Sequence, residues 1–395
     1  MARYFQRLDA CGKGEGKVAW CTSVGPAELL RSFGFEVYFP ENHGAFLGAA
    51  RAAGEMIPAA TKLGYGDDVC SYLTSDIGAY LQGTTPLAEH YGIAQIPRPD
   101  LLVYSTNQCR EVQEWFSFYA RTLNIPIAGI CPPRHLDRVE SADIDNVVAQ
   151  TRAIIPICEQ VSGRRFDLER FIETVRLSRE AAVLWRRVLE TAMATPAPLS
   201  FFDGCIQMGP IVVLRGTETA IDYYRVLLAE LEARVEEGVG VVGNEVCRLY
   251  WDGMPIWGRL RALSELMHRQ GAVVVASTYC NSWILDTMDE RTPFESTALA
   301  YTEIFINRSE SAKEAMLREL IGAYRIDGVI FHDARTCFNN SNARFGMPER
   351  LRAAASIPTL VIEGDLCDLR FYSDGQTATK LEAFIEQLID VHYPV

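Results

Sequence analysis

Cysteines are the residues of this 395-residue chain with the clearest capacity for chemistry, because a thiolate can bind a metal or attack an electrophile. Eleven are present, and none belongs to a CxxC motif. That absence argues against a zinc ribbon, a thioredoxin-like site and a bacterial ferredoxin sequence. Since most free cysteines in proteins are simply buried, their positions relative to the predicted strands decide which of them could be functional.

Two cysteines come shortly after a predicted buried strand and just before a helix. Cys109 follows the apolar run Leu101–Ser105, and Cys337 follows Gly328–His332. In open α/β sheets, ligands collect outside the carboxyl ends of the strands. A thiol there also lies near helix N-termini, whose dipoles favour the thiolate.

Cys70 has a similar position between a loop and a helix, which we expect Asp67 or Asp68 to cap. Thiolates on separate loops can hold an iron–sulfur cluster without CxxC spacing. The pattern therefore leaves two alternatives open: the three cysteines hold a metal cluster between two parts of the chain, or they are structural thiols.

The elements that must position these cysteines alternate between strands and helices at both ends of the chain. This βαβ order predicts an α/β fold with two doubly wound, Rossmann-like parallel-sheet domains. The first domain covers residues 1–150, a helical segment covers 151–239, and the second domain covers 240–395. The cleft between the two sheets is the expected place for a cluster. The predicted strands are 17–21, 36–39, 101–105, 125–130, 246–251, 272–277, 328–332 and 358–363.

Two glycine-rich segments resemble nucleotide-binding motifs but lack the required context. Gly238, Gly240 and Gly243 match GxGxxG, yet they follow a helix and precede a strand, which is the reverse of a dinucleotide fold. In CGKGEGK, Lys17 is followed by Val18 rather than Ser or Thr, so the Mg²⁺ ligand of a P-loop is missing. We expect this chain to hydrolyse no ATP itself.

Charge and composition exclude further classes. The net charge of −13 leaves no basic excess for a nucleic-acid backbone. No apolar run is long enough for a membrane span, and the N-terminus has no apolar signal region. These features predict a cytoplasmic protein with reduced thiols and no nucleic-acid or membrane partner.

Several motifs together resemble the family of 2-hydroxyacyl-CoA dehydratases and ATP-dependent benzoyl-CoA reductases. They are AWCTSVGPAELLRSFGFEVYFPEN, DDVCSY, DLLVYSTNQC, DGVIFHDARTC and IPTLVIEGDLCDLRFYSDGQTATKLEAFIEQL. The resemblance implies a heterodimer of two similar subunits, each with a [4Fe-4S] cluster held by three cysteines. Residue by residue, those cysteines correspond to Cys70, Cys109 and Cys337.

The residues after the third cysteine favour the reductase branch. Many dehydratases have acidic residues there, whereas this chain has Phe-Asn-Asn-Ser-Asn at 338–342. Within that branch the likeness is to the smaller catalytic subunit. It implies an ATP-dependent, ferredoxin-driven reduction of benzoyl-CoA, with a homologous larger subunit and two ATPase subunits as partners. A 2-hydroxyacyl-CoA dehydratase subunit and a non-catalytic electron-transfer subunit remain the alternatives.

Reduction of an aromatic ring also needs proton donors, and four candidates lie near predicted strand ends: His43, His332, Asp333 and Glu363. Hydrogen bonding within loops is the alternative role for each. The aromatic residues Trp251, Trp257, Tyr250 and Trp283 could line a pocket for the ring or pack in the core. Cys280 is a candidate thiol near the cluster, and the remaining cysteines considered are expected to be structural and buried: Cys21, Cys131, Cys205 and Cys367.

Overall fold

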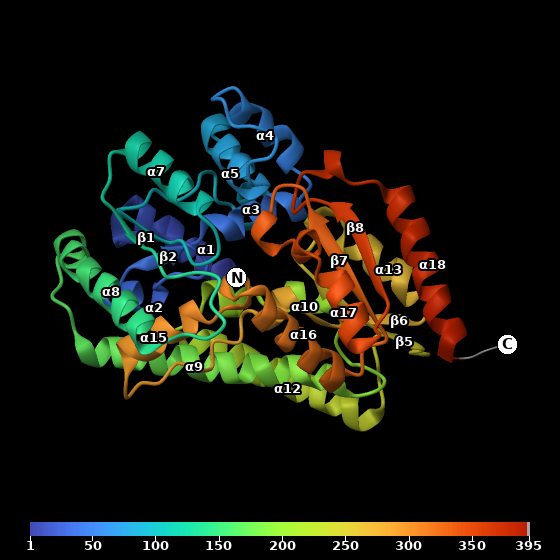
Figure 1. Cartoon of the computed structure of the whole chain (residues 1–395). Coiled ribbons are helices and arrows are strands. Elements are labelled where there is room, and N and C mark those ends of the chain that lie inside the picture. The colour runs from blue at the N-terminus through green and yellow to red at the C-terminus, as the bar shows by residue number, and fades with distance from the viewer. Residues whose placement is uncertain (393–395) are drawn as a thin grey trace.

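Two four-stranded parallel sheets organise the chain in the computed structural model, which describes residues 1–392 (Figure 1). The first sheet has the order β2-β1-β3-β4, and the second has the order β6-β5-β7-β8. We call the parts built on them the N-terminal unit and the C-terminal unit. The prediction of an α/β fold with two Rossmann-like sheets is confirmed.

The strands form where short apolar runs are buried on both faces, as parallel sheets require. Every residue of β1, β5 and β6 is buried. The first sheet contains β1 (Val18–Cys21), β2 (Glu36–Tyr38), β3 (Leu101–Ser105) and β4 (Ile127–Ile130). The second contains β5 (Cys247–Asp252), β6 (Ala272–Ser277), β7 (Gly328–Ala334) and β8 (Thr359–Gly364).

The helices of the N-terminal unit include four that the sequence interpretation did not single out, namely α1, α3, α4 and α6. The unit contains α1 (Ala2–Ala10), α2 (Ala27–Ser32), α3 (Pro40–Ala49), α4 (Ala53–Thr61), α5 (Ser71–Gln82), α6 (Leu87–Tyr91) and α7 (Glu111–Leu123). A short π-helical turn, Cys11–Glu15, connects α1 to β1, so the glycine-rich CGKGEGK segment forms no phosphate-binding loop between a strand and a helix.

Helices alone fill the chain between β4 and β5 in the part that the structure describes. They are α8 (Ser141–Ser162), α9 (Leu168–Glu190), α10 (Phe201–Gln207), α11 (Gly209–Val213) and α12 (Glu218–Glu237), with a 3₁₀ turn at Thr191–Met193. The long helices α9 and α12 pack side by side, and α9 also contacts α2 and α15 (Figure 1). Gly238 ends α12 with a φ of 66°, which confirms that the GxGxxG match is a helix stop.

The C-terminal unit completes the molecule, and α18 lies along the outer side of its sheet (Figure 1). Its helices are α13 (Leu260–His268), α14 (Thr278–Asn281), α15 (Pro293–Thr302), α16 (Glu310–Tyr324), α17 (Met347–Ala355) and α18 (Asp374–His392). Short 3₁₀ turns lie at Trp257–Arg259, Phe305–Asn307, Phe338–Asn340, Asn342–Phe345 and Leu369–Phe371. No helix among residues 1–392 has the length and apolarity needed to cross a membrane.

Candidate active site

The strand order of each sheet reverses at one point, and both points face the same cavity. The reversal lies between β1 and β3 in the first sheet and between β5 and β7 in the second. Ligands of open α/β sheets bind outside the carboxyl ends of the strands at such positions. The loop residues Ser23 and Gln108 line the cavity from the N-terminal unit, and Met254 and Asn340 line it from the C-terminal unit.

Cys70, Cys109 and Cys337 all line this cavity, which contains about 1160 Å³ of space including its open mouth. Cys70 directly precedes α5, Cys109 lies two residues before α7, and Cys337 precedes the 3₁₀ turn after β7. The sequence therefore located them correctly at the junctions of loops with helical segments. The predicted caps are wrong: Cys70 itself is the N-cap residue of α5, and Asp67 pairs with Arg370 instead.

Burial dominates the electrostatics of the three thiols. It raises the pKa of Cys109 to about 12 and raises the pKa of Cys70 and Cys337 as well. The other two thiols raise the pKa of Cys70 further, so the three groups are close enough to sense one another's charge. Acting against burial, the backbone N–H group three residues further along the chain lowers the pKa of each thiol. Without a metal the thiols are protonated, and metal binding would release those protons.

The donor set suits a cluster better than a single ion. Within residues 1–392, no group of three or more His, Cys, Asp or Glu side chains lies close enough together to hold one metal ion. A [4Fe-4S] cluster makes a different demand, because each of its cysteines binds a different iron and the sulfurs stand apart. Three buried thiols spread around one cavity fit that demand.

Glu41 is a cavity residue that the sequence interpretation missed. It lies at the start of α3, and its carboxylate accepts the Ser23 backbone N–H at 2.5 Å and an N–H of the Gln108 side chain. Burial raises the pKa of Glu41 to about 7. The side chain can therefore hold or release a proton near neutral pH, which is the property of a general acid or base. Its position just after β2 was the signal that could have found it.

Glu111 brings a second carboxyl group to the cavity at the first residue of α7. Burial raises its pKa to about 6, while the backbone N–H of Cys70 lowers it. Glu111 also raises the pKa of all three cavity cysteines. A carboxylate at this place would disfavour extra negative charge on the thiols, so it bears on any group that they hold.

Aromatic residues form much of the remaining wall. Two of the four candidates, Trp257 and Trp283, line the cavity, whereas Trp251 and Tyr250 lie buried outside the set of lining residues. Trp251 instead stacks on a phenylalanine ring of the core. The other aromatic lining residues are Tyr72, Trp115 and Tyr279. These rings give the site an apolar surface that can exclude water around a bound acyl group.

The four predicted proton donors lie outside the described cavity lining. His43 is buried, with Nδ1 2.6 Å from Asp76 Oδ1 and Nε2 2.9 Å from Thr85 Oγ1. His332 is also buried, and its Nδ1 lies 2.6 Å from the carbonyl oxygen of Met254, which lines the cavity. Their role in proton transfer stays a prediction.

Asp333 and Glu363 are held in ion pairs. Asp333 pairs with Arg344, and the exposed Glu363 pairs with Lys380 at 3.1 Å. The two residues are direct partners in the register of β7 and β8. Both carboxylates are therefore placed on one side of the second sheet, in contact with basic side chains. Their role as proton donors also stays a prediction.

The remaining cysteines differ in how far they follow the expectation of burial. Cys21, Cys205 and Cys367 are buried as expected, but Cys131 is exposed because it follows β4 at the edge of the first sheet. Cys205 is also part of the cavity wall. The Cys280 thiol interacts with that of Cys205 and lies outside the described lining. Cys280 therefore lies behind the wall rather than among the three candidate ligands.

The fold and the site define a class of protein: two Rossmann-like α/β units whose strand-order reversals share a cavity lined by cysteines. The chain belongs to the family described as "2-hydroxyglutaryl-CoA dehydratase, D-component", whose model matches residues 22–388. The predicted family resemblance is confirmed.

Named relatives in this family carry out two reactions. The chain is 30% identical to a benzoyl-CoA reductase component from Thauera aromatica over 379 residues, covering 92% of this chain and 86% of the relative. It is 29% identical to the (R)-phenyllactyl-CoA dehydratase alpha subunit of Clostridium sporogenes, covering 97% and 92%. It is also 29% identical to the lactoyl-CoA dehydratase alpha subunit of Anaerotignum propionicum, covering 96% and 92%. The family is therefore one of enzyme subunits that act on CoA thioesters.

Proposed function

We propose that this chain is a catalytic-core subunit of an ATP-dependent, ferredoxin-driven benzoyl-CoA reductase. The observation that carries the proposal is the single cavity that joins Cys70, Cys109 and Cys337 to Glu41 and an aromatic wall. The three thiolates would hold a [4Fe-4S] cluster, which supplies one-electron transfer when bound. The reductase relative supports this choice of reaction.

The reaction adds two electrons and two protons to benzoyl-CoA and yields cyclohexa-1,5-diene-1-carbonyl-CoA. Trp257 and Trp283 would pack against the ring and exclude water from it. Glu41 would hold a proton close to the substrate, because burial places its pKa near 7. Ser23 and Gln108 would orient the Glu41 carboxyl group through their hydrogen bonds.

The proposed complex is cytoplasmic and contains a homologous larger catalytic subunit, two ATPase subunits and ferredoxin as the upstream donor. The names of the relatives support a multi-subunit enzyme, since each is a subunit. A role for separate ATPase subunits is consistent with the sequence, which has no Walker-type GxxxxGK[ST] motif.

A 2-hydroxyacyl-CoA dehydratase subunit is the second candidate, because dehydratase subunits are similar to this chain over most of its length. Both reactions need low-potential electrons and an enclosed thioester site, so the cavity alone fits both. A non-catalytic electron-transfer subunit is the third candidate.

One experiment separates the three candidates. The anaerobic complex, with its ATPase and a low-potential reductant, is incubated with benzoyl-CoA or with a 2-hydroxyacyl-CoA. We expect ATP-dependent formation of the diene thioester from benzoyl-CoA. Formation of an enoyl-CoA from the hydroxyacyl substrate alone would identify a dehydratase. Turnover of neither substrate, with electron transfer to the partner subunit intact, would identify an electron-transfer subunit.

A further inference from the structure

The first amide of α5 is capped from the opposite half of the molecule. N–H groups at the start of a helix have no partner within the helix. At Ser71, the first residue of α5, the N–H donates to Thr336 Oγ1 at 3.0 Å. Thr336 lies in the loop after β7 of the C-terminal unit, and both residues are at least 98% buried. A cap of this kind usually comes from the residue just before the helix.

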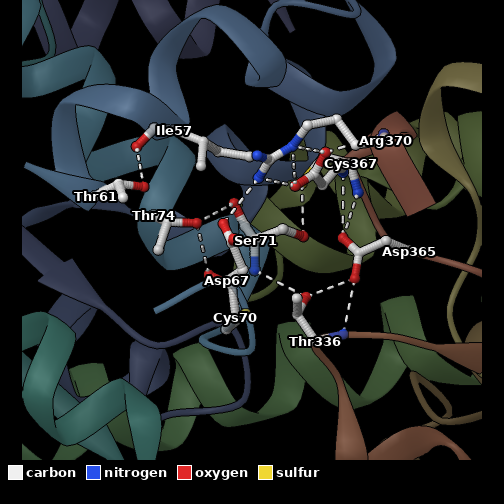
Figure 2. A network of polar contacts seen from close by, with 11 residues as sticks. Ile57, Thr61, Asp67, Cys70, Ser71, Thr74, Thr336, Asp365, Cys367 and Arg370 are labelled. Carbon is white, nitrogen blue, oxygen red and sulfur yellow. Dashed lines mark hydrogen bonds and ion pairs between the residues drawn. The ribbon is translucent and has the colours of Figure 1, made fainter. Parts of the chain in front are cut away.

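Asp365, which follows β8 and is fully buried, fixes the orientation of Thr336. Its Oδ2 accepts the backbone N–H of Thr336 at 2.9 Å and the Thr336 hydroxyl at 2.6 Å. Because the hydroxyl proton is directed at Asp365, an oxygen lone pair of Thr336 faces the Ser71 N–H. Figure 2 shows this series of contacts, with Cys70 beside Ser71.

The neighbours of these residues give the contact its meaning. Ser71 directly follows Cys70, and Thr336 directly precedes Cys337. The hydrogen bond between Ser71 and Thr336 therefore joins the two chain segments that present these cysteines to the cavity from different units. We call the contacts among Ser71 N–H, Thr336 Oγ1 and the Asp365 carboxylate the Thr336 latch.

We propose that Thr336 is a positioning residue for the cluster: its hydroxyl keeps Cys70 and Cys337 at the separation that binding of both requires. This inference rests on the proposed function, because it assumes that these cysteines hold a cluster. Two other contacts cross the same junction. They are the half-exposed ion pair of Asp67 with Arg370 and a 3.2 Å contact between Ser71 Oγ and Cys367 Sγ (Figure 2). Loss of the hydroxyl should therefore loosen the cysteines without separating the units.

The test removes the hydrogen bond from each side in turn. Thr336→Val removes the acceptor, and Thr336→Ser retains it. Ser71→Pro removes the donor at the first helical position, where proline is well tolerated, and Cys70 already has the extended ψ of 122° that suits a following proline. Ser71→Ala is its control, since it removes only the Ser71 hydroxyl.

A matched threonine in the same helix controls for the loss of a buried hydroxyl. Thr74 Oγ1 donates to the Cys70 carbonyl oxygen at 3.2 Å, within α5 and its cap. That carbonyl also accepts the Thr74 backbone N–H at 3.0 Å. Thr74→Val therefore leaves no group unpaired and does not touch the C-terminal unit.

The measurement is the rate at which the reconstituted complex loses iron to a ferrous chelator under anaerobic conditions. Leaving a buried N–H unpaired costs enough to predict roughly tenfold faster loss in Thr336→Val and Ser71→Pro. The Thr336→Ser, Ser71→Ala and Thr74→Val variants should lose iron at nearly the wild-type rate. In the metal-free chain, hydrogen exchange at the Ser71 amide should also be faster in Thr336→Val, and only slightly changed in Thr74→Val.

The outcomes separate the latch from the cluster on which it rests. Wild-type rates of iron loss in both Thr336→Val and Ser71→Pro would overturn the latch, provided that Cys70→Ser, tested alongside, loses its iron. Full iron in Cys70→Ser would overturn the cluster assignment itself. Faster loss in Thr74→Val to the same extent as in Thr336→Val would show a general loosening of α5 and would also overturn the latch.

Discussion

At the scale of single residues, three cysteines differ from the others in lying at the start of a helical segment and on a cavity wall. We predict that Cys70→Ser, Cys109→Ser and Cys337→Ser each lower the iron content of the anaerobically purified complex. A cluster that loses one of three protein thiolates is held too weakly to survive purification. Iron and acid-labile sulfide analyses, with the visible absorption spectrum, measure the effect.

Cys205 offers the matched control because it lines the same cavity without preceding a helix. Cys205→Ser should retain the iron content of the wild type. If iron falls equally in all four variants, a thiol in the cavity wall matters only for packing, and the assignment of ligands is wrong.

Glu41 supports a prediction about pH. Burial raises its pKa to about 7, so its carboxyl group loses its proton as the pH rises through that value. If Glu41 donates a proton, turnover should fall above about pH 7. Glu41→Gln should lower kcat by roughly 10²-fold or more and remove this alkaline limb. The pH profile of kcat, measured on variants with full iron content, checks the prediction.

Glu111→Gln is the companion variant, because Glu111 lines the cavity beside the cysteines and has a lower pKa, about 6. It should leave the limb near pH 7 in place. An unchanged alkaline limb in Glu41→Gln would exclude Glu41 as the titrating group.

The contrast between Glu41 and His43 shows what the sequence could and could not predict about the site. The rule that ligands gather at strand ends indicated the region after β2, and His43 was selected there because imidazole titrates near neutral pH. Two residues apart on a helix, however, side chains do not share a face. With Glu41 lining the cavity, His43 lies in the core against Asp76. Only the direction of α3 decides which of the two meets the substrate.

At the scale of elements, Asp76 joins the three helices that surround the cysteines of the N-terminal unit. From α5, its carboxylate lies 2.6 Å from His43 Nδ1 on α3. It also accepts the Trp115 indole N–H at 2.9 Å and the Tyr119 hydroxyl at 2.6 Å, both from α7. These helices carry or directly follow Glu41, Cys70 and Cys109. A single buried carboxylate thus fixes their relative positions.

We predict that Asp76→Ala destabilises the N-terminal unit by about 3–5 kcal/mol, because it leaves buried polar partners unpaired. Asp76→Asn should cost less, since an amide can still accept from α7 and donate to the imidazole. Urea unfolding followed by circular dichroism measures both variants. Equal destabilisation by the two would indicate that the negative charge, rather than the hydrogen-bonding geometry, holds the helices.

The accuracy of the predicted elements follows from how locally each is determined. The runs at β3 and β6 are continuously apolar and short, so their predicted ranges match the structure. The helices α3 and α4 have weak local signals: α3 begins with Pro40 and contains Gly44 and Gly48. Those glycines allow close approach, since a Cβ on Gly44 would meet Tyr72 and one on Gly48 would meet Cys367. Such helices depend on tertiary packing that sequence periodicity does not reveal.

At the scale of the whole molecule, buried polar contacts tie the two units together around the cavity. Arg215, in the segment between α11 and α12, pairs with Glu28 of α2 at 3.2 Å and donates to the Tyr301 hydroxyl of α15 at 3.1 Å. Both charged side chains are 99% buried. Removing one partner of such a pair is costly, so the units are not free to open as a hinge. The cavity is therefore largely formed before a ligand arrives, which favours a site that stabilises charge by fixed geometry.

One part of the cavity surroundings is exposed and apolar. Phe338, next to Cys337, is 47% exposed, and Phe345, a few residues further along the chain, is 52% exposed. The Arg344 guanidinium lies 4.5 Å from the centroid of the Phe338 ring. Exposed aromatic and arginine side chains are typical of the centre of a protein interface. This face of the C-terminal unit is where we expect the homologous subunit to bind, enclosing the open mouth of the cavity.

We therefore predict that Phe345→Glu weakens the heterodimer by at least tenfold in Kd, because a charge would replace an aromatic side chain in a desolvated contact. Val226→Glu is the control, since Val226 is 71% exposed but lies on α12, which does not line the cavity. Sedimentation velocity on the purified anaerobic complex measures the dissociation, with iron content checked in both variants. Because the cavity would then be open to solvent, Phe345→Glu should also lose its iron faster in air than Val226→Glu. Equal association of the two variants would move the partner away from the Cys337 face and leave the open cavity to be enclosed in some other way.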